Sequence, residues 1–191
     1  MNELAAIDPI QAPGPSDADL VREVLRGDQA AFGALVNRHQ TLLYRHACGM
    51  GLDHDTSLDI VQDAFVKAYA SLGECRDPAR FRAWVARIGR NLCLDHLKNI
   101  RRASIPLSQL ERADEIPDGR PVSGDVEHTL REALLRLPPA LREAFLLKHD
   151  AGYTYDEVAE LTETSPSAAK MRVHRAREAL RAFLVAQGVA A

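Results

Sequence analysis

The sequence predicts an all-α protein made of two small helical domains joined by a flexible linker. Apolar residues recur at spacings of three and four along most of the chain, as in amphipathic helices. The 191 residues are 46% apolar and only 5% aromatic, and the apolar set is mostly Leu, Ala and Val, which favours helix. The segment 103–127 lacks this periodicity and is rich in Pro, Gly and acids, so it separates two groups of helices.

The first domain is expected to span residues 17–102, after a flexible tail over 1–16 that ends in QAPGPS. Ser16 is placed to cap a first helix, which Gly27 ends. Asp28 is placed to cap a second helix, which has a long apolar side and runs to Gly49. A third helix is expected from about Asp53 to Leu72.

The third helix has an acidic first half. Asp53 and Asp55 fall in the first turn, where carboxylates complement the helix dipole. Asp59 and Asp63 lie further along the helix, so the dipole does not account for them. A carboxylate row beside Gln62 and Phe65 is suited to a basic partner protein.

The helix expected over 81–102 is the most informative stretch. Its apolar stripe faces a core: Phe81, Trp84, Val85, Ile88 and Leu92. A second row carries cations away from that stripe: Arg87, Arg90, Lys98 and Arg101. Asn91 lies on the border, where an amide can read a base edge while guanidinium groups bind phosphate.

A basic helix face is often only a solvated surface, whose long side chains cover apolar neighbours. Here the positive charge is concentrated: residues 76–102 hold eight Lys and Arg against two Asp, a net +6, while the whole chain is −3. Because phosphate contacts depend on local cation density, this favours a nucleic-acid role.

The second domain is expected over 128–187. Pro138-Pro139 separates two of its helices, and Thr154 with Glu157 forms a capping box for a short helix. A tight turn over 162–165 then leads into a helix that starts at Pro166. The order helix, short turn, cationic helix describes a helix-turn-helix, a motif that also occurs in cores that never contact DNA. The last helix carries five Lys and Arg against one Glu, which favours DNA binding.

The sequence offers little support for an enzyme. Paired His and Asp residues such as Asp95-His96 and His149-Asp150 have no HExxH, CxxC or Gly-rich phosphate-loop companion. The three cysteines lack metal-ligand spacing and are read as thiols in a reducing compartment. We therefore expect no catalytic residue, metal or cofactor. No apolar run reaches the ~18 residues of a membrane span, and a cationic leader is missing, so a cytoplasmic protein is expected.

Three stretches resemble an RNA polymerase sigma factor of the extracytoplasmic-function (ECF) type. DIVQDAFVKAY at 59–69 resembles region 2.2, which docks on the clamp helices of the polymerase β′ subunit. CRDPARFRAWVARIGRNLCLDHLKNIRR at 75–102 resembles regions 2.3 and 2.4, which open and read the promoter −10 element. The stretch 137–181, ending in MRVHRAREALR, resembles region 4, which reads the −35 element and contacts the β flap.

The resemblance implies site residues. The residues implied for polymerase docking are Asp59, Gln62, Asp63 and Phe65. Those implied for binding the −10 element, with a base flipped from its strand, are Cys75, Arg76, Asp77, Arg87, Asn91, Lys98 and Arg101. Those implied for reading the −35 element are Lys170, Met171, His174, Arg175 and Arg177.

Some residues depart from the family pattern. Cys75 stands where an aromatic is frequent, so stacking on the flipped base is expected to be weaker. Glu163 stands where a glycine is common in the helix-turn-helix turn, and Thr162 where an apolar residue is usual. Ala168-Ala169 replaces the usual Thr-Val. A less well packed turn is expected, and a −35 preference that differs from the family's.

The resemblance also implies partners: core RNA polymerase, promoter DNA and an anti-sigma factor, often membrane-anchored, that holds the protein inactive. No small-molecule substrate is expected. We further predict that the isolated protein holds its two domains close and binds promoters poorly until polymerase fixes their separation. The alternative is a conventional helix-turn-helix regulator, which binds an operator without core polymerase and leaves Asn91 and its basic helix without a role.

Overall fold

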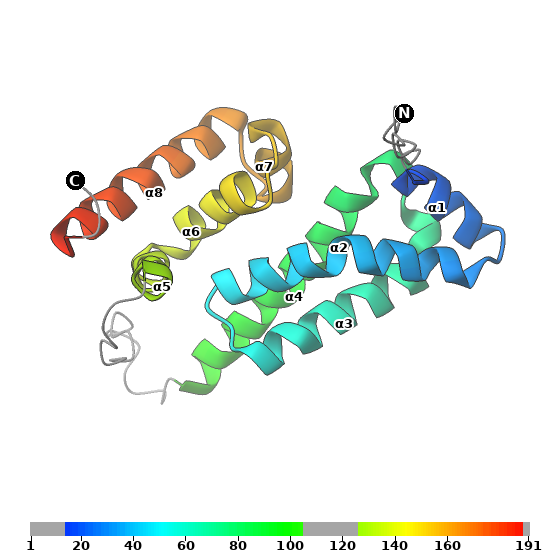
Figure 1. The fold of residues 1–191 in the computed structure, drawn as a ribbon, viewed down its shortest axis with the longest axis horizontal. Helices are drawn as coiled ribbons and strands as arrows, with labels where there is room; N and C mark the ends of the chain where they lie inside the picture. Colours follow the sequence, from blue (N-terminus) through cyan, green and yellow to red (C-terminus); the bar gives the residue numbers. More distant parts are fainter. Residues whose placement is uncertain (1–13, 105–125, 189–191) are drawn as a thin grey trace, which may run out of the picture.

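The computed structural model describes residues 14–104 and 126–188, and within these ranges its secondary structure is helical, with no strand. Figure 1 shows two groups of helices side by side, an N-terminal unit (14–104) and a C-terminal unit (126–188). The all-α prediction with two helical domains is confirmed. Most of the expected linker, 103–127, and most of the expected tail, 1–16, lie outside the described residues.

Eight α-helices make up the two described ranges. Those of the N-terminal unit are α1 (Asp17–Leu25), α2 (Gln29–Gly49), α3 (His54–Ala70) and α4 (Phe81–Ser104). Those of the C-terminal unit are α5 (Val126–Arg136), α6 (Pro139–Phe145), α7 (Tyr155–Leu161) and α8 (Pro166–Ala186). Three short elements join them: the 3₁₀ turns η1 (Leu72–Glu74) and η2 (Pro78–Arg80), and the π-helical turn η3 (Leu146–Asp150).

Side-chain caps fix the starts of several helices. Ser16 and Asp19 form a capping box at α1, and Thr154 and Glu157 form the predicted one at α7. Asp28 caps α2 as predicted. The third helix ends at Ala70 rather than Leu72, because the chain tightens there into η1.

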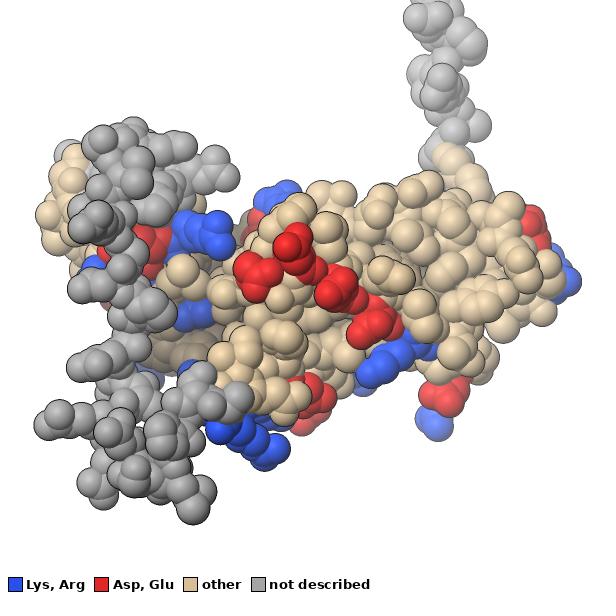
Figure 2. Space-filling model, turned by 90° about the horizontal axis from the view of Figure 1, so that it is seen from below, with Lys and Arg blue, Asp and Glu red and all other residues tan. Residues whose placement is uncertain are grey.

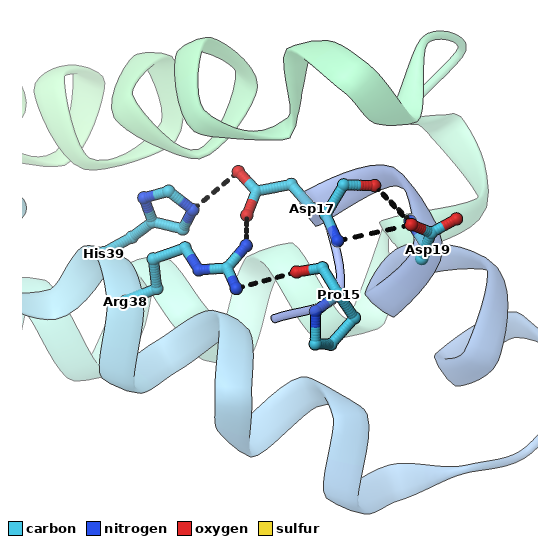
Figure 3. Close-up of polar contacts among 6 residues, drawn as sticks. Pro15, Asp17, Asp19, Arg38 and His39 are labelled. Atoms are coloured by element: carbon cyan, nitrogen blue, oxygen red, sulfur yellow. Dashed lines mark hydrogen bonds and ion pairs between the residues drawn. The ribbon is translucent and has the colours of Figure 1, made fainter. Parts of the chain in front are cut away.

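The start of α1 is tied to α2 by a partly buried polar cluster (Figure 3). The Asp17 carboxylate accepts a hydrogen bond from Arg38 Nη1 at 2.5 Å and lies 2.8 Å from His39 Nε2, while Arg38 Nη2 donates to the Pro15 carbonyl. Burial lowers the pKa of His39, although Asp17 opposes that effect. The His39 ring also lies against Phe81, at 5.7 Å between centroids, which fixes the start of α4.

The apolar stripe of α4 meets this core as predicted. Phe81 and Val85 are fully buried, and Trp84, Ile88 and Leu92 are partly buried against the same cluster. That cluster continues into the C-terminal unit through residues of α6 to α8, including Leu147, Tyr153 and Val173. The two units are therefore in contact, and the C-terminal unit is seated beside α4.

The helix-turn-helix is present between α7 and α8. Its turn is better filled than the sequence suggests, because Thr162 is buried, with its hydroxyl donating to the Val158 carbonyl at 2.7 Å and 3.2 Å from the Thr164 hydroxyl. The expectation of a less well packed turn is wrong at Thr162. Glu163 takes a left-handed backbone conformation, with φ of 54°, a region that favours glycine.

Candidate nucleic-acid and polymerase interfaces

The outer face of α3 presents the acidic row predicted for protein docking. Asp59, Gln62 and Asp63 are all exposed. Apolar side chains accompany them, with Leu58 48%, Val66 61% and Tyr69 45% exposed. Seen from below in Figure 2, a row of acidic residues crosses a face that is otherwise mostly uncharged. Carboxylates beside exposed apolar groups suit a protein partner that carries cations.

Phe65 does not belong to this exposed set. It is only 5% exposed, and its ring packs edge-on against Phe32 at 6.2 Å between centroids. The physical reason is its position on the inward face, in line with Val61 and Ala68, both of which are buried. Its inclusion among the docking residues needs correction: it supports the face from within the core.

On α4, the structure brings the predicted −10 residues together around two cavities. Cys75, Arg76, Asp77 and Arg87 line the first, of about 420 Å³. Asn91 and Lys98 line the second, of about 410 Å³. Arg101 lies one turn beyond Lys98 and is exposed. A cavity beside a row of cations suits a base removed from its stack, with phosphates held by guanidinium groups.

Cys75 is a wall of the first cavity rather than an exposed contact. Its side chain is buried, its thiol donates to the Asp77 carbonyl at 3.5 Å, and burial raises its pKa. Trp84 lines the same cavity, so an aromatic ring is present although position 75 lacks one. Sequence reasoning placed Trp84 only in the core stripe and did not select Arg80, which also lines the cavity. The sequence carries no signal that separates Trp84 from the rest of the apolar stripe.

The predicted −35 residues all lie on the outer side of α8. Lys170, Met171, His174, Arg175 and Arg177 are exposed, Met171 by 49%. The opposite side of the helix is buried through Ala169, Val173, Ala176 and Leu180. The His174 ring lies 3.4 Å from Glu178. A helix held by one face with cations on the other is the arrangement in which a recognition helix enters the major groove.

Ion pairs join the two units across α4. Glu160 of α7 pairs with both Arg80 and Arg87, the latter at 3.0 Å. Glu143 of α6 binds Arg90 with two contacts, at 2.6 and 3.3 Å, and both side chains are largely buried. These pairs place carboxylates of the C-terminal unit on the cations of the predicted −10 face.

Backbone and apolar contacts add to those ion pairs. Arg82 donates to the Ala151 carbonyl, and its guanidinium lies over the Tyr153 ring at 4.6 Å. The Tyr153 hydroxyl donates to the Arg82 carbonyl at 3.2 Å. A Cβ at Gly49 would come within 2.8 Å of Leu146, so glycine permits the close approach. The units share a packed boundary rather than isolated surface contacts.

No group of three or more His, Cys, Asp or Glu within 14–104 and 126–188 is arranged to hold a metal ion. None of the helices described here combines the length and hydropathy of a membrane span.

Comparison with known families matches both halves of the chain. The family "Sigma-70 region 2" matches residues 35–103, and "Sigma-70, region 4" matches residues 127–180. The first covers most of α2 to α4, and the second covers α5 to most of α8. The acidic face of α3, the α4 cavities and the helix-turn-helix thus fall inside the matched ranges.

Curated proteins and solved structures agree with these matches. RNA polymerase sigma factor NccH of Alcaligenes xylosoxydans xylosoxydans is 35% identical over 175 residues, covering 88% of this chain and 94% of NccH. RNA polymerase sigma-H factor of Pseudomonas aeruginosa is 30% identical, covering 86% of this chain and 91% of its own length. ECF RNA polymerase sigma factor SigW of Bacillus subtilis is 28% identical, covering 84% of this chain and 92% of SigW.

Two solved structures share the fold. CnrH, in complex with the cytosolic domain of CnrY, is 29% identical with a TM-score of 0.68, over 90% of this chain and 99% of that chain. RpoE, in complex with the anti-sigma factor NepR from Bartonella quintana, is 25% identical with a TM-score of 0.65, covering 80% of this chain and 96% of the RpoE chain. Family ranges, relatives and fold lead to one conclusion: this chain belongs to the sigma-70 family of RNA polymerase sigma factors, as an ECF-type member.

Proposed function

We propose that this sigma factor joins core RNA polymerase through the exposed face of α3 and places the enzyme on promoters with two DNA-reading helices. In this proposal Asp59, Gln62 and Asp63 contact the β′ clamp helices, and the C-terminal unit contacts the β flap. The support is the surface of α3, where the exposed carboxylates of Asp59 and Asp63 lie beside exposed apolar side chains.

The −10 element is read by α4. Single-stranded DNA binds through phosphate contacts to Arg87, Lys98 and Arg101, with a base received by the cavity of Cys75 and Trp84. Extrusion of a base costs a few kcal/mol, which stacking on an aromatic ring and hydrogen bonds to the protein can offset. The observation that carries the proposal is the part of this cavity that the N-terminal unit supplies, because Cys75, Trp84 and Arg87 line it. Arg87 lies about one helical turn from Asn91, which lines the second cavity.

The −35 element is read by α8 through Lys170, Met171, His174, Arg175 and Arg177. These side chains are exposed on one face of a 21-residue helix. The polymerase supplies the chemistry of RNA synthesis, and no catalytic step is assigned to this chain.

We also propose an anti-sigma factor as a partner, membrane-associated in the cell, that controls release of the sigma factor to polymerase. The support is that CnrH and RpoE, which share this fold, were solved in complexes with the CnrY cytosolic domain and the anti-sigma factor NepR.

Run-off transcription with core polymerase on a genomic promoter library tests the proposal. Wild-type protein should yield discrete transcripts, and the double variant Asn91→Ala, Lys170→Ala should lose most of them. Glu132→Gln is the matched control, because Glu132 lies on α5 and pairs locally with Arg136. Undiminished initiation by the double variant would refute the assignment of both helices.

The alternative, a regulator that acts without polymerase, is separated by co-purification. The sigma-factor proposal expects core polymerase to be retained by immobilised wild-type protein and to be lost with Asp59→Ala, Asp63→Ala. A regulator need not retain it at all.

A further inference from the structure

The DNA-binding face proposed for α4 is already occupied by this chain's own carboxylates. Glu160 of α7 accepts hydrogen bonds from Arg80 and Arg87, two cations that line the first cavity. The Arg80 hydrogen bond lowers the pKa of Glu160 below its usual value, so the group is ionised at neutral pH. A carboxylate between two guanidinium groups takes the place that a phosphate would take.

Both cavities on α4 are closed on one side by the C-terminal unit. Glu157, Glu160 and Leu161 line the first cavity together with the loop at Cys75 to Asp77. Glu163 lines the second cavity together with Asn91 and Lys98. Each cavity that would receive DNA therefore has an acidic residue of α7, or of the turn after it, at its edge.

Glu163 is placed there at a conformational cost. Its φ of 54° is the one positive value among the non-glycine residues of the described ranges. Glycine adopts this region freely, whereas a side chain at this position is strained. Backbone conformation favours glycine at position 163, so it does not explain why a glutamate lines the cavity of Asn91 and Lys98. Strained residues of this kind concentrate at switch regions and binding sites.

We infer that the C-terminal unit acts as an intramolecular mimic of DNA: Glu160 and Glu163 cover the −10-reading face of α4 in the free protein and leave it when the units separate. The inference rests on the proposed function and adds the regulation of the same site. A −10 strand and α7 compete for Arg80, Arg87 and the Asn91 cavity, so the free protein cannot engage the strand fully.

The ion pairs of Glu160 with Arg80 and Arg87 are weak enough to break reversibly. The side chains of Glu160, Arg80 and Arg87 remain about half exposed, at 46%, 50% and 46%. Exposed pairs of this kind each change an equilibrium by a factor of about two to five. The Glu160 pairs therefore add little to the free energy that a partner must supply to separate the units; most of that free energy lies in the buried pair of Glu143 with Arg90 and in the shared apolar core.

The test measures DNA binding by the full chain without polymerase. The probe is a fluorescein-labelled, randomised 20-nucleotide DNA single strand, followed by fluorescence anisotropy at fixed salt. The double variant Glu160→Gln, Glu163→Gln should bind the strand roughly tenfold more tightly than wild type. Glu132→Gln alone and Glu23→Gln, Glu132→Gln, which matches the double variant's charge change, should stay within about twofold of wild type, because neither residue lines either cavity.

Equal affinity of wild type and the Glu160, Glu163 variant, whether strong or weak, would overturn the inference. So would an equal gain in the charge-matched variant, since that would reflect net charge alone. Failure of the proposed function has a different signature: transcription by the holoenzyme would not depend on Asn91 or Lys170, whatever the free protein's DNA affinity.

Discussion

Neutralising Glu143 should separate the two units of the free protein. Glu143 and Arg90 form the most buried of the ion pairs described between the units, with side chains only 6% and 12% exposed. The substitution Glu143→Gln removes the charge and keeps one amide oxygen near Arg90. The guanidinium then remains in a largely buried place without a counter-charge.

The size of the effect follows from that burial. Breaking a buried pair by removing one partner costs about 3–5 kcal/mol, and the retained amide oxygen favours the lower end. The chain can avoid this cost by letting Arg90 reach water, which requires the units to part. A penalty of about 3 kcal/mol then shifts the closed–open equilibrium towards the open form by at most about two orders of magnitude.

Small-angle X-ray scattering of the free protein measures this opening. Glu143→Gln should increase the radius of gyration and tighten binding of single-stranded DNA, while far-UV circular dichroism stays helical. Glu132→Gln removes the same charge from an exposed pair with Arg136 and should leave the radius unchanged. An unchanged radius and unchanged DNA affinity in Glu143→Gln would refute the role given to this pair.

Three further predictions concern buried or strained residues. Burial lowers the pKa of His46 to about 4. The stability that depends on a neutral His46 ring is therefore complete above pH 6.5 and is lost as pH falls towards 4. Between pH 7 and 4, the unfolding free energy of wild type, measured in urea titrations, should fall by about 3 kcal/mol more than that of His46→Leu. Glu163→Gly relieves the left-handed backbone and should raise the free energy of unfolding by about 0.5–1 kcal/mol in the same assay. Burial raises the pKa of Cys93 to about 12, so iodoacetamide at pH 8 should leave Cys93 unmodified in the native chain and label it in urea, as read by peptide mass spectrometry.

Each of these has a contrary outcome. In the structure both ring nitrogens of His46 are buried without a hydrogen-bond partner. If the unfolding free energies of wild type and His46→Leu changed in parallel with pH, His46 would not be buried as a neutral ring. A less stable Glu163→Gly would mean that the Glu163 side chain stabilises the turn. Rapid native alkylation of Cys93 would mean that its cluster with Ala47, Leu52 and Ile60 opens readily.

Much of the fold was predictable because it depends on local signals. The caps at Ser16 and Asp28 and the capping box at Thr154 are short-range patterns, and the stripe from Phe81 is a periodic one. These features need only neighbouring residues, so the sequence displays them directly.

The candidate site was predictable in its cations and exposed amide but not in its depth. Phe65 and Cys75 were assigned as contacts by resemblance to the family, yet each side chain is buried. Phe65 lies at helical spacing from Val61 and Ala68, so the local apolar pattern indicates burial, whereas the family resemblance alone does not separate a supporting residue from an exposed contact. The apolar stripe predicts the core side of Trp84, but its additional place in a cavity wall depends on tertiary packing.

The pairing of carboxylates with α4 cations was beyond sequence reasoning. Arg80 and Glu160 are 80 positions apart, and Arg90 and Glu143 are 53 apart. At such separations the sequence does not indicate which of many carboxylates a given cation contacts, because tertiary packing decides the pairing. The expectation that the domains stay close did not indicate which faces meet.

The most direct test compares promoter affinity with and without core polymerase at matched salt, on one promoter obtained by run-off transcription. We expect the free protein to bind it weakly, because α4 is covered and α8 is not held at the distance of the second element, and the holoenzyme to bind it at least a hundredfold more tightly, as joining two sites can produce. Equal affinity in the two measurements would contradict the account.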